Sequence, residues 1–183
     1  MRVTADHWLT RVTRQPSPNC DERPDPDDIA LLVVHNISLP AGSFGTGYVE
    51  SLFCNTLDCT AHPSFAELEG LEVSAHLFIS RRGRIVQFVP FNQRAWHAGL
   101  SVWQGRQRCN DFAIGIELEG VDDRAYTKSQ YRSLKRVSQA LLRRYPRLVS
   151  NSIVGHCEIA PGRKSDPGPA FDWPRYLGAL RTE

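Results

Sequence analysis

The sequence has no long hydrophobic run and little net charge. It holds no stretch of about 18 consecutive apolar residues, so a membrane-spanning helix of ordinary length is excluded. Lys and Arg number 22 against 20 Asp and Glu, and the net charge of +2 is too small to favour nucleic acid or an anionic membrane surface. The first residues also lack the apolar segment of a secretory signal, and we therefore expect a cytoplasmic protein.

Cysteines are few, and they form no metal-binding pattern. There are five, an odd number, scattered along the chain. Neither a disulfide framework nor the paired short spacings of a structural zinc site can be recognised among them. We expect reduced thiols, which fits an intracellular compartment. The five are Cys20, Cys54, Cys59, Cys109 and Cys157.

The length and composition suit one domain. A chain of 183 residues with 41% hydrophobic residues can bury a sizeable core. We predict a single domain over residues 1–183, with its core between residues 29 and 175. Four prolines stand among charged residues before residue 29, so residues 1–28 are predicted to be an extended N-terminal segment at the surface.

Four segments have the pattern of β-strands. The nearly continuous apolar runs Ile29–His35 and Phe112–Leu118 are typical of strands buried on both faces. Val73–Ser80 and Arg84–Val89 are rich in β-forming residues and are joined through Gly83, which predicts a hairpin.

Helical signals lie between and after these strands. Thr127–Gln130 has the form of a capping box and predicts an amphipathic helix that stops before Pro146. A short strand is expected over residues 150–155. The long insertion 36–72 is expected to be a functional wall or lid. It is predicted to contain two short helices, near residues 48–57 and 64–68. Strands and helices interspersed in this way predict an α/β (mixed α+β) fold with a central mixed β-sheet flanked by helices.

The segment from Gly155 to Gly168 carries the strongest chemical signal. Pro161, Gly162, Pro167 and Gly168 lie in this segment, so we predict a shaped loop in place of a regular helix or strand. His156 and Asp166 are both good zinc ligands, and a catalytic zinc ion needs three protein ligands. His35 at the end of an apolar strand is the best candidate for the third. Cys157 is disfavoured, because adjacent residues of an extended segment point to opposite sides.

Two carboxylates follow each other on one side of the second buried strand. Glu117 and Glu119 are two residues apart near the strand's end, which places both on the same face. Either one could act as an acid or base, and sequence alone does not choose between them.

Five motifs together resemble the zinc N-acetylmuramoyl-L-alanine amidases related to peptidoglycan recognition proteins and phage T7 lysozyme. Three further segments are most similar to the AmpD branch of that family, the cytoplasmic anhydro-muropeptide amidases of cell-wall recycling. The resemblance covers residues 29–175. The five motifs are Val34-His35-Asn36, Val73-Ser-Ala-His76, Arg94-Ala-Trp-His-Ala-Gly99, Ile114-Gly-Ile-Glu117, and Gly155-His156 with Lys164-Ser-Asp166. The three further segments are Arg106-Gln-Arg-Cys-Asn-Asp111, Glu117-Leu-Glu-Gly120 and Asp166-Pro-Gly-Pro-Ala-Phe-Asp-Trp173.

The resemblance implies a function and roles for particular residues. It implies one zinc ion per chain, held by His35, His156 and Asp166. It also implies Glu117 as the general base, with Glu119 as the alternative, and Lys164 as the residue that stabilises the transition state. The expected substrate is an anhydro-muropeptide, cut between the lactyl group of the muramic acid and L-alanine. Loss of that activity in a cell would derepress an inducible β-lactamase.

Six further residues are candidates for substrate binding. Trp96 and His97 stand in a loop, where an exposed ring could stack on a sugar. Arg108 and Arg163 could pair with the carboxylates of an acidic stem peptide. Asn36 could hold substrate or backbone. His76 is assigned first to packing or to hydrogen bonding behind the site, and second to substrate contact.

One position departs from the resemblance, and three other functions compete. Glu72 stands where the AmpD branch can carry a basic residue, so local substrate contacts are expected to differ. The alternatives are a zinc-free muropeptide binder, a regulatory protein that acts by contact, and an amidase of intact peptidoglycan. The complete ligand set disfavours the first, and the lack of an export signal disfavours the third. No nucleic acid, membrane or obligate protein partner is expected.

Overall fold

A six-stranded mixed β-sheet forms the centre of the computed structural model, which describes residues 1–181. The sheet contains β1 (Thr13–Arg14), β3 (Leu31–Ile37), β4 (Leu77–Ile79), β5 (Ile85–Gln87), β9 (Ala113–Glu119) and β10 (Ile153–Gly155). Their order is β1-β5-β4-β9-β3-β10, and every neighbouring pair is parallel except β4 and β5. That antiparallel pair is the predicted hairpin, in which Gly83 takes a φ of +81°. The predicted fold class is confirmed.

The two central strands bury both of their faces, as their apolar sequences predict. β3 and β9 pair from Leu31 opposite Ala113 to Ile37 opposite Glu119. Alternate residues of each strand belong to different core clusters. Because side chains alternate along a strand, His35 of β3 lies on the face of Leu31, and Glu117 of β9 lies on the face of Ala113. This face carries the chemistry described below.

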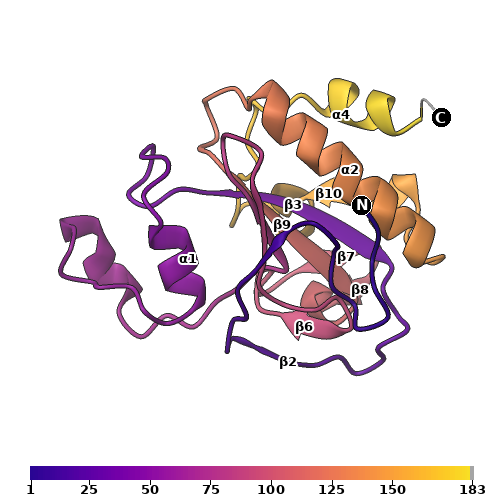
Figure 1. Cartoon of the computed structure of the whole chain (residues 1–183), viewed down its shortest axis with the longest axis horizontal. Coiled ribbons are helices and arrows are strands. Elements are labelled where there is room, and N and C mark those ends of the chain that lie inside the picture. Colours follow the sequence, from indigo (N-terminus) through magenta and orange to yellow (C-terminus); the bar gives the residue numbers. More distant parts are fainter. Residues whose placement is uncertain (182–183) are drawn as a thin grey trace.

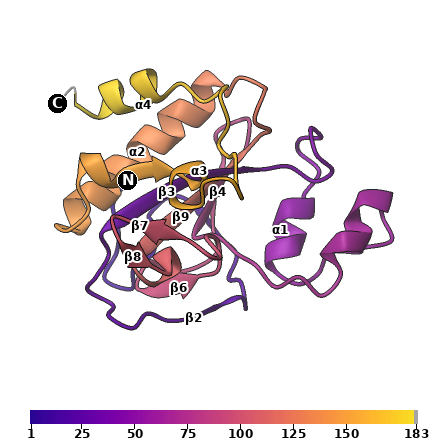
Figure 2. The same ribbon diagram turned by 180° about the vertical axis from the view of Figure 1, so that it is seen from behind.

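Helices cover the other face of the sheet. The helix α2 (Lys128–Arg144) begins with the predicted capping box, in which Thr127 and Gln130 bond reciprocally. Its Leu134 and Val137 belong to the same core cluster as Leu32 of β3. The helix α4 (Trp173–Leu180) packs beside α2, and the two lie together along one side of the sheet in Figures 1 and 2.

The face that carries His35 is covered by the segment 90–111. The segment contains β6 (Gln93–Ala95), β7 (Val102–Trp103), β8 (Arg106–Gln107) and the 3₁₀ turn η2 (Cys109–Asp111). Ala98 and Cys109 pack in one cluster with Leu31 and Val33 of β3. The strands of this segment are only two or three residues long.

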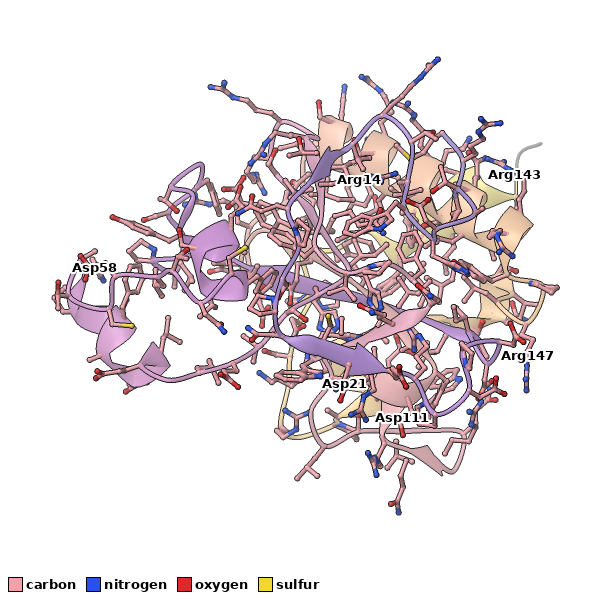
Figure 3. All side chains as sticks on the ribbon, turned by 60° about the horizontal axis from the view of Figure 1, so that its bottom comes forward. Arg14, Asp21, Asp58, Asp111, Arg143 and Arg147 are labelled. Atoms are coloured by element: carbon pink, nitrogen blue, oxygen red, sulfur yellow. The ribbon has the colours of Figure 1, made fainter. Side chains whose placement is uncertain are left out.

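The N-terminal segment is more than the extended surface segment that was predicted. It contributes β1 to the main sheet, and its β2 (Cys20–Glu22) pairs with β6. Leu9 and Arg23 are buried, at 1% and 5% exposure. Arg94 forms ion pairs with both Asp21 and Asp111, which are labelled near each other in Figure 3. The prediction of a surface segment was therefore wrong for these residues. A high proline content does not show which strands or side chains a segment contacts in the folded protein.

The insertion 36–72 forms a lobe beside the sheet. It holds the helix α1 (Tyr48–Phe53) and the 3₁₀ helix η1 (Pro63–Leu68), close to the predicted positions. Figure 1 shows this lobe projecting from the body of the molecule, and Figure 3 places Asp58 near its tip. Val49, Leu52 and Phe53 of α1 anchor the lobe in a core cluster with β4 and β5.

The segment after β10 begins differently from the prediction. A 3₁₀ turn, η3 (Ser150–Ser152), precedes β10, and one helical turn, α3 (His156–Ile159), follows it. Only the part beyond Ala160 is loop. Within residues 1–181, no helix is both long and apolar enough to cross a bilayer.

Candidate metal centre and active site

Three side chains that were predicted as zinc ligands converge at one point. His35 comes from the second half of β3, His156 is the first residue of α3, and Asp166 belongs to the loop that follows. The Nδ1 atoms of the two histidines are 3.0 Å apart, and each is 3.1 Å from Asp166 Oδ2. Parallel pairing of β10 with β3 places Gly155 beside Val34, which brings the two histidines together. Within residues 1–181, no other group of His, Cys, Asp or Glu side chains forms such a cluster, and Cys157 is outside it.

The hydrogen-bond partners of this cluster favour a cation at its centre. His156 Nε2 is 3.1 Å from the carbonyl oxygen of Ala98, which can only accept, so this nitrogen carries the proton and Nδ1 presents a lone pair. That lone pair faces a carboxylate oxygen and a second imidazole nitrogen. Three ligand atoms around tetrahedral zinc would be about 3.3 Å apart, given bonds of about 2.0–2.1 Å. The observed separations of 3.0–3.1 Å fit such an ion.

Burial and hydrogen bonding prepare these groups as ligands. Burial lowers the pKa of His35 to about 4, so its imidazole is neutral at physiological pH, as metal binding requires. Burial alone would raise the pKa of Asp166, but hydrogen bonds with His156 and His35 outweigh it and hold the pKa below its usual range. The cluster therefore offers the neutral imidazole of His35 and the carboxylate of Asp166, beside the Nδ1 lone pair of His156.

Glu117 is a buried carboxylate beside this cluster. Burial, and next the charge of Asp166, raise its pKa well above the ordinary value, while Lys164 opposes the rise. Its Oε2 atom has no hydrogen-bond partner among the described residues. Glu117, Lys164, His156 and Asp166 all line one cleft of about 270 Å³. A carboxylate with a raised pKa, next to a possible metal site and an ammonium group, can exchange protons with a bound substrate.

Glu119 has a different environment, although it lies on the same face of β9. Its two oxygens accept hydrogen bonds from the backbone N–H groups of Gly45 and Arg81, the second at 2.7 Å. It lines a separate hollow together with Gly45 and Arg81, and it does not line the cleft. Glu119 therefore ties the insertion and the hairpin to the sheet.

Three of the six substrate-binding candidates line the cleft: Asn36, Trp96 and His97. Asn36 Nδ2 donates to Asp122 Oδ1 at 2.7 Å and to the carbonyl of Pro167 at 3.1 Å, which holds the loop of Asp166 in place. The indole Nε1 of Trp96 donates to Asp21 Oδ1 at 3.1 Å and fixes the ring.

The other three candidates lie outside the cleft. His76 is fully buried, accepts a hydrogen bond from Gly115 N at 3.1 Å and contacts the guanidinium of Arg23. These surroundings are those expected from the first assignment, packing and hydrogen bonding behind the site, and a substrate contact of His76 stays a prediction. Arg108 and Arg163 line a neighbouring groove of about 660 Å³. Arg163 is bonded to the carbonyls of Ala98 and Leu100.

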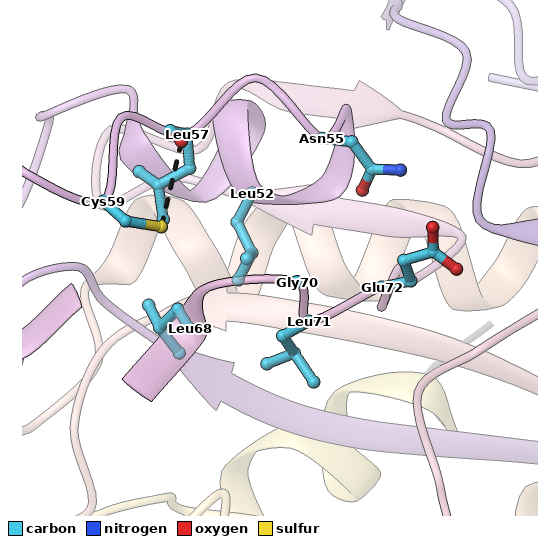
Figure 4. A pocket seen from close by; sticks show the side chains of 8 residues that line it. All are labelled: Leu52, Asn55, Leu57, Cys59, Leu68, Gly70, Leu71 and Glu72. Atoms are coloured by element: carbon cyan, nitrogen blue, oxygen red, sulfur yellow. Dashed lines mark hydrogen bonds between the residues drawn. The ribbon is translucent and has the colours of Figure 1, made fainter. Parts of the chain in front are cut away.

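Sequence reasoning missed the residues that support the site from behind. Arg23 donates to the carbonyls of Phe91, Asn110, Asp111 and Ala113 from a proline-rich segment, where nothing in the sequence marks it as buried. The apolar wall of the cleft, formed by Leu52, Leu68 and Leu71 of the insertion, was expected only as an unspecified wall or lid. These three leucines also line an adjoining pocket of about 190 Å³, in which Glu72 lies at the rim (Figure 4).

Comparisons with known proteins show to which family the chain belongs. The family described as N-acetylmuramoyl-L-alanine amidase matches residues 25–169. The 1,6-anhydro-N-acetylmuramyl-L-alanine amidase AmpD of Escherichia coli (strain K12) is 59% identical over 176 residues, which are 96% of each chain. The protein of that name from Salmonella typhimurium (strain SL1344) is 59% identical over 169 residues, 92% of this chain and 90% of that one.

Solved structures show the same relationship. The crystal structure of a Se-Met AmpD derivative superimposes with a TM-score of 0.95 at 55% identity and covers 98% of this chain and 99% of that chain. The amidase AmiD from E. coli, solved with anhydro-N-acetylmuramic acid-L-Ala-D-γ-Glu-L-Lys as substrate, has a TM-score of 0.62 at 29% identity, over 83% of this chain and 57% of that one. The chain thus belongs to the N-acetylmuramoyl-L-alanine amidase family, and within it to the AmpD type.

Proposed function

We propose that this protein is a zinc-dependent amidase that cuts the bond between the lactyl group of 1,6-anhydro-N-acetylmuramic acid and L-alanine, in cytoplasmic recycling of peptidoglycan. The observation that carries the proposal is the position of Glu117, whose Oε2 atom has no hydrogen-bond partner among the described residues. Glu117 lines one cleft with His156 and Asp166, which form a cluster with His35. The substrates named for the AmpD and AmiD relatives support the choice of bond. Five cysteines without disulfides support a reducing compartment.

The chemistry follows from the side chains in the cleft. A zinc ion held by His35, His156 and Asp166 would supply Lewis acidity to the substrate carbonyl and acidify a water molecule. Glu117, whose pKa is raised by burial, would take the proton of the attacking water and deliver it to the departing nitrogen of L-alanine. The ammonium group of Lys164 would face the carbonyl oxygen as charge develops on it, a contribution often worth about 3–4 kcal/mol for one well-placed donor.

The cleft also suggests how the sugar is recognised. Trp96 offers a ring that its hydrogen bond to Asp21 already holds in place, so little entropy is lost when a sugar stacks on it. The anhydro bridge removes the hydroxyl at the reducing end of muramic acid. A ring that keeps this hydroxyl would bring a polar group to be desolvated without a partner. We therefore expect preference for the anhydro form.

The proposal is tested with purified, zinc-loaded protein. Anhydro-muropeptide, its reducing-sugar counterpart and polymeric peptidoglycan are digested in parallel and the products are identified by mass spectrometry. We expect cleavage at the lactyl–alanine bond, with kcat/KM at least about tenfold higher for the anhydro form, the scale of one mismatched polar group. Equal turnover of all three substrates would overturn the recycling role and would favour an amidase of intact peptidoglycan.

Two variants separate metal binding from proton transfer. Asp166→Ala removes a ligand and should lower zinc content and activity together. Glu117→Gln should keep zinc but lose at least about 100-fold in kcat, as expected for a residue that transfers protons. Full zinc content in Asp166→Ala, or an active Glu117→Gln, would contradict the assigned roles.

A further inference from the structure

The outer nitrogens of both histidine ligands are held by two adjacent residues, His97 and Ala98. His35 Nε2 is 2.9 Å from His97 Nδ1, and His156 Nε2 is 3.1 Å from the carbonyl oxygen of Ala98. The carbonyl oxygen of Ala98 can only accept, so His156 carries its proton on Nε2. When His97 Nδ1 also accepts, His35 carries its proton on Nε2 as well. Both Nδ1 lone pairs then face the centre of the cluster.

One side chain holds the backbone of these two residues. Asn110 Oδ1 accepts from the N–H of His97 at 3.1 Å and from the N–H of Ala98 at 2.8 Å. Asn110 belongs to η2, whose neighbour Cys109 is fully buried, so the acceptor stands on a fixed part of the fold. A single carbonyl oxygen thus sets the position of the groups that orient both ligands.

The ring of His97 lies directly against a glycine of the central strand. A Cβ atom built on Gly115 would lie 2.4 Å from His97 Cγ, and its three nearest atoms all belong to that ring. Any side chain at this position of β9 would therefore move His97 away from His35. This explains in physical terms why the strand has its one glycine on the face that carries the site.

We propose that His97 and Asn110 are positioning residues for the metal centre: they fix the tautomer and the rotation of His35 and His156. The inference rests on the proposed function, because it assigns these residues to the metal of that site. Partners of this kind raise the basicity of a ligand and fix its ring, and their loss typically lowers metal affinity 10–100-fold. His97 and Asn110 act through the ligands and need not contact the reacting atoms.

Zinc affinity of the purified protein tests the proposal without any amidase assay. Affinity is measured by competition with a chromophoric chelator, and the absorption spectrum of the Co²⁺-substituted protein reports the geometry of the site. We expect 10–100-fold weaker zinc binding and an altered cobalt spectrum for His97→Ala and Asn110→Ala. Asn110→Asp keeps the accepting oxygen and should stay within about threefold of wild type. His62→Ala, on the insertion away from the site, is the matched histidine control.

A double variant distinguishes positioning from general loss of structure. Gly115→Ala should weaken zinc binding when His97 is present, because the new methyl group displaces the ring. In the His97→Ala background the same substitution should change zinc affinity little. Additive losses, or wild-type affinity in both His97→Ala and Asn110→Ala, would overturn the proposal. Wild-type affinity in Asp166→Ala would instead show that the proposed metal site itself is wrong.

Discussion

Glu117 and Glu119 show how two identical residues on one strand acquire different roles. Both are buried on the same face of β9, at 9% and 5% exposure. The oxygens of Glu119 are satisfied by backbone N–H groups, whereas Oε2 of Glu117 has no partner. A buried charge without a partner is costly, so Glu117 is maintained at the expense of stability, which is common for groups that transfer protons.

This cost predicts a pH-dependent gain in stability for Glu117→Gln. An unfolded chain ionises this carboxyl near its ordinary pKa of 4.5, while the folded protein retains the proton to higher pH. The folded state therefore binds more protons above pH 4.5, and the stability of the wild type falls as pH rises through the interval between the two pKa values. Glu117→Gln has no such loss of stability. In urea unfolding of the metal-free proteins, its free energy of unfolding should exceed that of the wild type by a difference that grows with pH, on the order of 1–3 kcal/mol.

Glu119→Gln is the control for that experiment. It removes one of two oxygens that accept backbone N–H groups, so it should lower the free energy of unfolding at neutral pH. If both variants were destabilised equally at every pH, the raised pKa of Glu117 would not be the cause of the change in stability.

At the residue scale, the sequence predicts side chains whose chemistry is distinctive and misses those whose role depends on contact. His35, His156 and Asp166 could be proposed as a set because ligand types and strand ends narrow the choice. Asn110 could not, because an amide that accepts two backbone N–H groups looks like any loop asparagine in sequence. The complete burial of His76 could not be predicted either, because burial of a single strand residue depends on what packs over it.

At the scale of elements, the start of α2 could be predicted because it depends only on residues next to each other in the sequence. Thr127 Oγ1 accepts from the N–H of Gln130 at 3.1 Å, and the Gln130 side chain accepts from the N–H of Thr127 at 3.0 Å. The apolar positions of the helix then follow the helical period. Such signals need no knowledge of the rest of the chain.

The cap predicts a measurable loss on substitution. Thr127→Ala removes the acceptor for Gln130 N and also the bond from Thr127 Oγ1 to the carbonyl of Arg81 at 2.7 Å. We expect a loss of about 1–2 kcal/mol in the free energy of unfolding by urea, with amidase activity unchanged at 25 °C. Lys128→Ala, one residue later and exposed, should stay within about 0.5 kcal/mol of wild type. Equal effects of the two substitutions would contradict the capping role.

Short elements were not predictable in the same way. β1, β7 and β8 have two residues each, too few to show a period, and they exist because a partner strand is next to them. No helix was predicted at α3, because its segment is rich in prolines and glycines. It forms because Glu158 accepts from Gly155 N at 2.8 Å and caps the turn before the first proline is reached.

At the scale of the whole molecule, the site joins parts of the chain that the core already holds in place. His35 is on β3, and the segment with His156 and Asp166 follows β10, the strand that pairs with β3. Apolar clusters lie on both faces of this sheet and contain none of the three ligands. The candidate metal site is therefore an addition to a complete core, unlike a small domain that folds around its ion.

Removal of the metal should consequently lower stability without unfolding the protein. An ion that binds only the folded state stabilises it by about 4 kcal/mol when its concentration is 1,000 times Kd. For a domain of this size that corresponds to a shift in Tm on the order of 10 °C. We expect chelation to leave the far-UV circular dichroism unchanged and the thermal transition cooperative but at lower temperature, and added zinc to restore it. In Asp166→Ala the same treatment should shift Tm much less. A chelated protein without a cooperative transition would show that the ion, and not the apolar clusters around β3 and β9, holds the sheet together.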